Sequence, residues 1–247
     1  MAGHSKWKQI KRKKAVTDAR RGAAFTKLIK EITIAAKQGG GDPAGNARLR
    51  TAIDAAKAAN MPADNIDRAV KKGTGELEGV QYEDVTYEGY GPGGAAIFVE
   101  CTTDNANRTV ADLRNIFSKN HGNLGTSGSV AWMFDRRGQI LVDASRFDED
   151  TTMEAALDAG AQDMVREGDA YVITTEVGDF HAVQEGLRAR KIAWDSAEVA
   201  MIPRNTVKVD GGNAKNLVRL MEAIEEHDDV AKVFSNFDVD EEALAEV

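Results

Sequence analysis

The spacing of apolar residues changes at about residue 82 and divides the chain into a helical part and a mixed part. Before this point apolar residues recur every three or four positions, which is the spacing of one helix face. The stripes within 25–36, 49–59 and 66–70 predict three helices, with the second beginning at Asp42-Pro43 and the third ending at Gly73. Short amphipathic helices in succession predict a three-helix bundle.

After residue 82, short apolar runs are interleaved with helical patterns, which is typical of α+β domains. We predict strands at 85–90, 95–102, 130–134, 139–143, 170–176, 195–202 and 230–238, and helices at 105–120, 151–166, 179–190 and 213–227. Segment 81–134 lacks a second helix to cover its sheet, and segment 204–247 would supply one.

The predicted fold is therefore α+β and multidomain, with an N-terminal three-helix bundle followed by two α+β sandwich domains, one inserted in the other. The expected boundaries are 1–16 for a basic arm, 17–80 for the bundle, 81–134 plus 204–247 for a discontinuous domain, and 135–203 for the inserted domain.

The two ends of the chain carry opposite charge. Residues 1–72 hold 17 Lys and Arg against 6 Asp and Glu, a net charge of +11, whereas the rest holds 15 against 34, a net charge of −19. Such segregation indicates a polyanion held at one end, with phosphates contacted by cations that lie largely off the apolar stripes. Trp7 among the lysines is suited either to stacking on a base or to packing on the bundle. The candidate nucleic-acid contacts are Lys6, Trp7, Lys8, Lys11, Arg12, Lys13, Lys14, Arg20, Arg21, Lys27, Lys30, Lys37, Arg48, Arg50, Lys71 and Lys72, with Lys57 and Arg68 continuing the same charge.

Three loop segments are further candidates for contact. Gly89, Gly91 and Gly94 match G-x-G-x-x-G, but strand-like residues follow, so a hairpin turn is expected and not a dinucleotide site. Segment 122–129 is glycine-rich without the lysine of a P-loop, so a shaped loop is favoured over a phosphate cradle. In segment 103–109 helix capping by Asp104 or Asn105 is favoured over phosphate contact. The candidate loop contacts are Tyr87, Tyr90, Gly91, Pro92, Gly93, Asn105, Asn107 and Arg108.

The sequence predicts no catalytic, metal or cofactor site. No pair among the four histidines has the i,i+4 spacing of a metal site, and a single cysteine, Cys101, excludes a disulfide framework and a multi-thiolate zinc site. The acidic runs at 148–150, 225–229 and 238–242 are interpreted as solvated faces. No apolar run could span a bilayer, so no membrane partner is expected. The single cysteine is typical of the reducing cytoplasm, and the absence of catalytic motifs indicates a non-enzymatic protein. An enzyme that uses a cleft between the α+β domains is an alternative without any supporting motif.

Ordered motifs extend along the whole chain: MAGHSKW at 1–7, FTKL at 25–28, GGGDP at 39–43, NMP at 60–62, NI at 65–66, KKGTG at 71–75, YEGYGPGG at 87–94, TDN at 103–105, NRT at 107–109, FSK at 117–119 and NLG at 123–125. Together they resemble the YebC/PmpR family, from which Thr102 and His121 depart where a leucine and a glycine are expected. The resemblance implies three domains and a cytoplasmic, non-enzymatic regulator. Because the opening motif begins at Met1, no presequence is expected.

The resemblance leaves the physiological target open between two kinds of nucleic acid. Members of the family are commonly described as DNA-binding transcriptional regulators. Others, including a mitochondrial translational activator of cytochrome c oxidase, look like translation factors that bind the ribosome and relieve stalling on proline-rich stretches. The sequence shows no recognition helix directly after a tight turn, which weakens sequence-specific DNA binding, and the lysine-rich arm suits ribosomal RNA equally well. The oligomeric state is not predicted.

Overall fold

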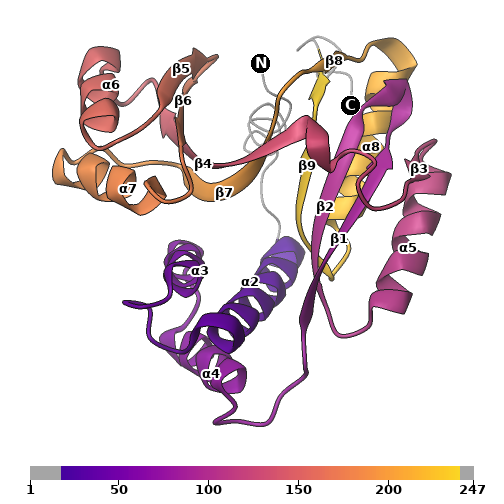
Figure 1. The fold of residues 1–247 in the computed structure, drawn as a ribbon, viewed down its shortest axis with the longest axis horizontal. Coiled ribbons are helices and arrows are strands. Elements are labelled where there is room, and N and C mark those ends of the chain that lie inside the picture. The colour runs from indigo at the N-terminus through magenta and orange to yellow at the C-terminus, as the bar shows by residue number, and fades with distance from the viewer. Residues whose placement is uncertain (1–17, 240–247) are drawn as a thin grey trace.

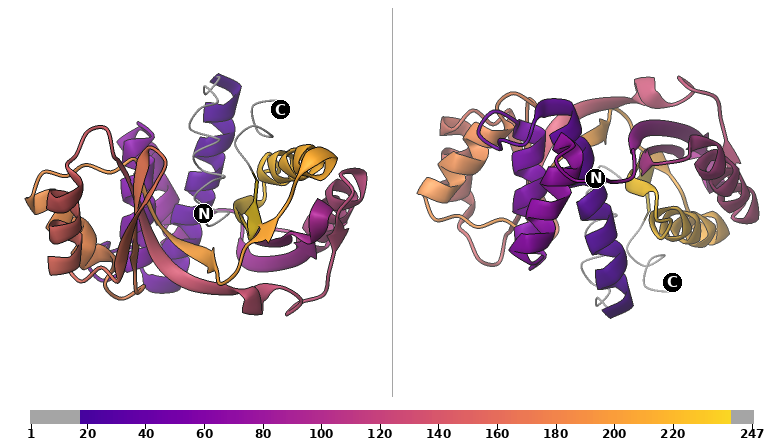
Figure 2. Two further views of the ribbon diagram at one scale, coloured as in Figure 1. Left: turned by 90° about the horizontal axis from the view of Figure 1, so that it is seen from above. Right: turned by 90° about the horizontal axis from the view of Figure 1, so that it is seen from below.

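The computed structural model describes residues 18–239, which form a helical bundle and two sheet domains (Figure 1). The predicted basic arm, 1–16, therefore lies outside the described residues. No helix within 18–239 combines the length and the apolar character that a membrane crossing needs. Figure 2 shows helix α2 (Asp18–Gly39) between the two sheet domains in views from above and from below.

The bundle consists of α2, α3 (Ala47–Ala58) and α4 (Ala63–Thr74). Its core is built from the predicted stripes, with Ile32, Leu49 and Ala56 fully buried among their neighbours. The predicted start of the second helix at Asp42-Pro43 was wrong. Asp42 accepts a hydrogen bond from the Ala44 amide in a local turn, and the helix begins after Asn46, whose Oδ1 accepts the Leu49 amide at 3.0 Å.

The third helix was also predicted to end too early, at Gly73. It continues to Thr74, and Gly73 lies inside the helix against α2, where a Cβ atom would lie only 2.3 Å from the Thr33 carbonyl oxygen. Gly73 is therefore a close-packing residue and not a helix stop. The helix ends at Gly75, which adopts a left-handed φ of 83° that glycine tolerates without strain.

The first sheet has the strand order β3-β1-β2-β9, with β1 (Glu83–Tyr90), β2 (Ala96–Thr103), β3 (Asn123–Leu124) and β9 (Val230–Ser235). All of its pairings are antiparallel, and β1 and β2 are joined by the predicted turn, which contains the 3-10 segment η1 (Pro92–Gly94). Helices α5 (Ala106–Lys119) and α8 (Gly211–Glu225) supply Leu113, Phe117, Leu217 and Met221 to its core. The segment after residue 204 thus completes this sheet domain, as the sequence predicted. A short parallel pair, β8 (Val207–Lys208) with β10 (Phe237–Asp238), was not predicted.

The second sheet has the order β5-β6-β4-β7, with β4 (Phe134–Asp143), β5 (Asp163–Glu167), β6 (Ala170–Thr175) and β7 (Ser196–Pro203). Helices α6 (Glu149–Asp158) and α7 (Phe180–Ala189) pack on it. The predicted helix 151–166 was wrong in its second half. It ends at Asp158, Gly160 turns the chain with a φ of 100°, and 163–167 form β5.

The predicted strands 130–134 and 139–143 are also different in the structure. A 3-10 turn, η2 (Ala131–Met133), precedes one continuous strand, β4, because the amides of Val130 and Ala131 bond to the Glu88 carboxylate and not to a neighbouring strand. The α+β multidomain class, with one sheet domain inserted in the other, is confirmed. The numerical domain boundaries stay a prediction.

Candidate nucleic-acid interface

The predicted phosphate contacts divide into three groups by position. Lys6, Trp7, Lys8, Lys11, Arg12, Lys13 and Lys14 lie outside the described residues. Arg20 and Arg21 belong to α2, but their side chains are not described. The remaining predicted cations, Lys27, Lys30, Lys37, Arg48, Arg50, Lys71 and Lys72, all belong to the described bundle.

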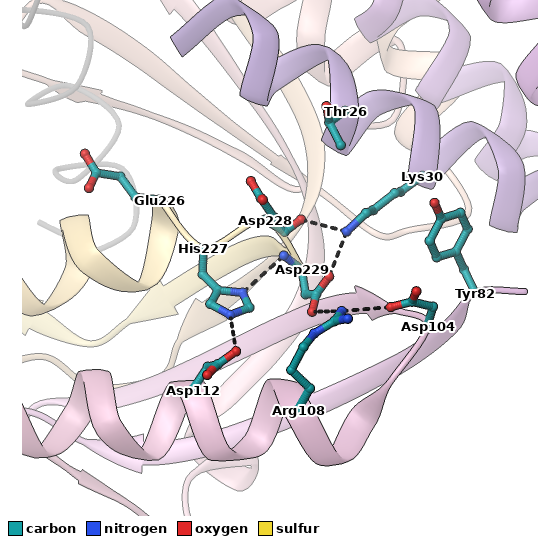
Figure 3. Close-up of a pocket in the computed structure, with 10 residues that line it drawn as sticks. All are labelled: Thr26, Lys30, Tyr82, Asp104, Arg108, Asp112, Glu226, His227, Asp228 and Asp229. Carbon is teal, nitrogen blue, oxygen red and sulfur yellow. Dashed lines mark hydrogen bonds and ion pairs between the residues drawn. The ribbon is translucent and has the colours of Figure 1, made fainter. Parts of the chain in front are cut away.

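The first contact between the bundle and the first sheet domain is centred on Asp229 (Figure 3). The Lys30 Nζ on α2 lies 2.8 Å from Asp229 Oδ1 and donates to the Asp228 carbonyl oxygen at 3.0 Å. Asp229 Oδ2 accepts from Arg108 at 2.9 Å and from the Thr109 hydroxyl at 2.9 Å, both on α5. Only 9% of Lys30 and 3% of Asp229 are exposed, so this is a buried ion pair.

The charge of Asp229 is maintained by its partners. Burial by itself raises the pKa of this carboxyl, but the hydrogen bonds from Lys30, Arg108 and Thr109 together outweigh burial and hold the pKa well below its usual range. Asp229 lies in the acidic run 225–229, and the interpretation of that run as a solvated face was wrong for this residue. Its partners are distant in the sequence, so no local pattern could have identified them.

A second contact joins the bundle to the start of β1. Arg48 on α3 bonds to Glu31 at 2.8 Å through Nε and to Asp84 at 3.2 Å through its second terminal nitrogen. Burial raises the pKa of the Asp84 carboxyl, but its hydrogen bond with Arg48 leads the effects that bring the pKa below its ordinary value. Lys37 donates to the Tyr82 carbonyl oxygen at 3.2 Å, and Lys27 donates to the Glu225 carbonyl oxygen.

Four of the predicted phosphate contacts, Lys27, Lys30, Lys37 and Arg48, therefore already hold the bundle against the body of the protein. A phosphate would have to compete with these intramolecular bonds. The assignment of these four residues to nucleic acid stays a prediction.

Other cations of the bundle face solvent. Lys57, Arg68 and Lys72 are exposed. Lys71 forms an exposed ion pair with Asp67 at 2.8 Å, and Arg50 is half-buried with a bond to the Pro43 carbonyl oxygen at 3.3 Å. The exposed cations lie on α3 and α4, away from the contacts centred on Asp229 and Asp84. This solvent-facing set is the part of the described bundle that is free to approach phosphates without breaking the described contacts.

The connection between α3 and α4 resembles that of a helix-turn-helix motif in length. Only residues 59–62 separate the two helices, and the expectation that the chain has no recognition helix after a tight turn stays a prediction. The N-terminal turns of a recognition helix approach the bases. In α4 these turns expose Asp64 and Asp67, which would repel the DNA backbone.

The predicted loop contacts are largely structural. Asn105 caps α5 by accepting the Arg108 amide at 3.1 Å, which confirms the capping interpretation. Arg108 pairs with Asp104 and Asp229. The Tyr87 hydroxyl bonds to the Ala106 carbonyl oxygen, Gly91 and Pro92 are buried, and Gly93, Asn107 and Tyr90 are exposed.

A cavity of about 530 Å³ opens beside the ion pair of Lys30 and Asp229 (Figure 3). Its cations are Lys30 and Arg108, and its five acidic side chains outnumber them. Its lining consists of Thr26, Lys30, Tyr82, Asp104, Arg108, Asp112, Glu226, His227, Asp228 and Asp229. Such a lining disfavours phosphate, and no cluster of His, Cys, Asp or Glu within 18–239 is arranged to hold a metal ion.

Comparison with known proteins identifies the chain. Residues 5–76 match a family model described as the TACO1/YebC protein N-terminal domain, and residues 82–237 match one described as the TACO1/YebC second and third domain. The chain belongs to the TACO1/YebC family. The predicted resemblance to YebC proteins is therefore confirmed.

Other members of the TACO1/YebC family are similar over their full length. A protein of Gemmatimonas aurantiaca is 61% identical with 100% of both chains covered, and one of Desulforapulum autotrophicum is 56% identical with 98% of both covered. Both carry the name "Probable transcriptional regulatory protein". The crystal structure of a conserved hypothetical protein from Aquifex aeolicus is similar with a TM-score of 0.85 and 45% identity, covering 92% of this chain and 94% of that one.

Proposed function

We propose that this chain is a non-enzymatic regulator of gene expression that binds nucleic acid through its basic N-terminal part. The observation that carries the proposal is the charge segregation, +11 over residues 1–72 against −19 over the remainder. A polyanion is attracted to the first part and repelled by the second, so the acidic domains would orient the bound complex. The names of the relatives support a role in regulation.

DNA is the leading target, because the relatives are named as transcriptional regulators. The arm and the solvent-facing cations Lys57, Arg68 and Lys72 would bind phosphates. Contacts with phosphates carry little information about the base sequence. A transcriptional regulator in the cytoplasm that binds in this way would depend on DNA shape or on further factors for its specificity.

The alternative is a translation factor that binds ribosomal RNA in the ribosome and relieves stalling on proline-rich sequences. The acidic N-terminal turns of α4 favour this alternative, because a helix that exposes Asp64 and Asp67 there is poorly suited to reading the major groove. Structured RNA is recognised mostly through shape and backbone, which needs no such helix.

Two measurements test the proposal. The affinity of the full chain for duplex DNA is measured against salt concentration for the wild type and for the combined variant Lys11→Gln, Lys13→Gln and Lys14→Gln. If the three lysines contact phosphates, the slope of log affinity against log salt becomes shallower by about 2 to 3, since each neutralised phosphate contributes about 0.9. An unchanged slope would remove these lysines from the mechanism.

The matched control neutralises three exposed cations of the inserted domain, Arg166, Arg188 and Lys191, and we expect it to leave the slope unchanged.

Crosslinking in cells, followed by sequencing of the bound nucleic acid, then separates promoter DNA from ribosomal RNA. Recovery of neither above background would contradict the proposed function.

A further inference from the structure

Two exposed aromatic side chains lie together at the loop that joins the two sheet domains. Trp132 in η2 is 64% exposed and Tyr90 at the end of β1 is 36% exposed. The Trp132 indole N–H donates to the Ser129 carbonyl oxygen at 3.1 Å, and the Tyr90 hydroxyl donates to the same oxygen at 2.9 Å. The polar edges of both rings therefore converge on one backbone atom.

The loop beneath these rings is held by a buried carboxylate. Glu88 is 4% exposed and accepts the amides of Gly128, Val130 and Ala131 at 2.7, 2.7 and 2.8 Å. Burial raises the pKa of the Glu88 carboxyl, but the three amide bonds bring it below its ordinary value, so the side chain is ionised at neutral pH. Charge-assisted bonds of this kind fix the backbone on which Trp132 is mounted.

The residues on both sides of Trp132 are also anchored. Val130 is fully buried and Phe134 is 4% exposed, in a core shared with Phe98 and Phe234 of the first sheet. The Arg204 amide donates to the Met133 carbonyl oxygen at 2.9 Å. Trp132 is therefore presented to solvent by a fixed backbone, which lowers the entropy lost when a ligand binds to it.

The charge around this site differs from that of the rest of the body. Residues 113–134 contain no Asp or Glu, although the chain beyond residue 72 has a net charge of −19. The same segment carries exposed Arg114 and Lys119, and the Glu88 charge is enclosed by amides. The next residue, Asp135, is paired with Arg204 at 2.8 Å. A polyanion can approach this segment without the repulsion that the acidic faces impose.

We propose that Trp132 and Tyr90 form a stacking platform for an unpaired base of single-stranded nucleic acid. This inference rests on the proposed function and adds to it a second contact, distant in sequence from the basic arm. Because the indole N–H and the phenol hydroxyl are already bonded to Ser129, neither is free to read a base edge, so stacking would be tolerant of base identity. Because the neighbouring carboxylates Glu88 and Asp135 are already bonded to backbone amides and to Arg204, the site favours nucleic acid over a basic protein segment as the occupant.

The test uses the full chain with Trp7→Phe and Trp194→Phe, which leaves Trp132 as the single fluorescent tryptophan. It is titrated with twelve-nucleotide oligo(U), oligo(dT) and a DNA duplex of the same length. We expect a single strand to quench the fluorescence more than the duplex does, and the comparison of the two single strands distinguishes RNA from DNA. Equal quenching by the duplex and the single strands, or none by any of them, would overturn the platform.

Affinity measurements in the otherwise unchanged chain give the second readout. Trp132→Ala should weaken single-strand binding about 5- to 150-fold, which corresponds to the loss of one stacked base, whereas Trp132→Phe should restore most of it. Trp194→Phe in the inserted domain is the control and should have no effect. Thermal unfolding of each variant checks that it is folded, and the quenching of Trp132, which needs no Ala variant, keeps the test decisive if Trp132→Ala is not folded.

The outcomes separate this inference from the proposed function. If oligonucleotides bind and Trp132→Ala leaves their affinity unchanged, the platform is wrong and the regulator proposal stands. If Trp132→Ala leaves that affinity unchanged and instead releases a protein that copurifies with the wild type, the site is a protein interface. If neither oligonucleotides nor duplex bind the wild type, both proposals fail.

Discussion

Asp229 joins three parts of the chain through one carboxylate, with Lys30 from α2 on one oxygen and Arg108 and Thr109 from α5 on the other. Removing one partner of a buried pair leaves the other charge uncompensated, which costs about 3–5 kcal/mol. We therefore expect Asp229→Asn to lower the free energy of unfolding by about that amount in urea denaturation at pH 7. The control is the exposed neighbour Asp228. Asp228→Asn should change the free energy of unfolding by less than about 0.5 kcal/mol.

The same carboxylate predicts how stability depends on pH. The folded protein holds the Asp229 pKa below its value in the unfolded chain, so the unfolded chain binds the proton more tightly. The stabilisation is therefore present above the unfolded pKa of about 4 and is lost as pH falls below it. Urea titrations between pH 7 and pH 2 should show a smaller decrease of stability for Asp229→Asn than for the wild type. An identical decrease would assign the acid sensitivity to other carboxylates.

At the scale of elements, Asn46 both caps α3 and bonds it to the end of α2. Asn46 caps α3 through Oδ1, and its Nδ2 donates to the carbonyl oxygens of Ala35 and Gly40 at 2.8 and 2.9 Å. We expect Asn46→Ala to destabilise the protein by about 1–3 kcal/mol, because it removes the cap and the two Nδ2 bonds, of which the bond to Ala35 is buried. Asn46→Asp keeps the cap but places a carboxylate oxygen against the carbonyl oxygens of Ala35 and Gly40, so it should not restore the lost stability. Asp42→Ala is the control, with a loss below about 0.5 kcal/mol in the same denaturation measurement.

The elements also show which features of the fold the sequence contains. Long periodic stripes, such as those of α2 and α5, were located to within a few residues because each stripe packs against a hydrophobic core. Errors occurred where a distant contact decides the local structure. The Glu88 carboxylate makes 131–133 a 3-10 turn, and the close approach of α4 to Thr33 of α2 explains why Gly73 stands inside the helix and does not end it. Helix and strand propensities depend on residues that are near in the sequence, so they could not predict either of these long-range contacts.

The sequence predicted the positive charge of the candidate site. It did not predict which of the cations are bonded within the protein and which face solvent. The excess of cations before residue 72 is visible in composition, but composition does not show which of them pair within the molecule. Lys30 and Arg48 have the same local surroundings as Lys57 and Arg68, namely a position on an amphipathic helix. Their acidic partners Asp229 and Asp84 lie in other domains, so only the folded structure separates docking cations from solvent-facing ones.

At the scale of the whole molecule, the two kinds of cation predict different effects on binding and stability. The combined variant Lys57→Gln, Arg68→Gln and Lys72→Gln should make the dependence of duplex affinity on salt shallower, by up to about 3 in the logarithmic slope, with little loss of stability. Lys30→Gln should instead lower the stability and leave the salt dependence unchanged. It leaves Asp229 without its ammonium partner and lowers the free energy of unfolding, while the slope stays the same because Lys30 is buried. Salt titrations of DNA affinity and urea denaturation of both variants make the comparison. If Lys30→Gln changes the slope and the solvent-facing triple variant does not, phosphates replace Asp229 on binding, and the bundle must then separate from the first sheet domain when nucleic acid is bound.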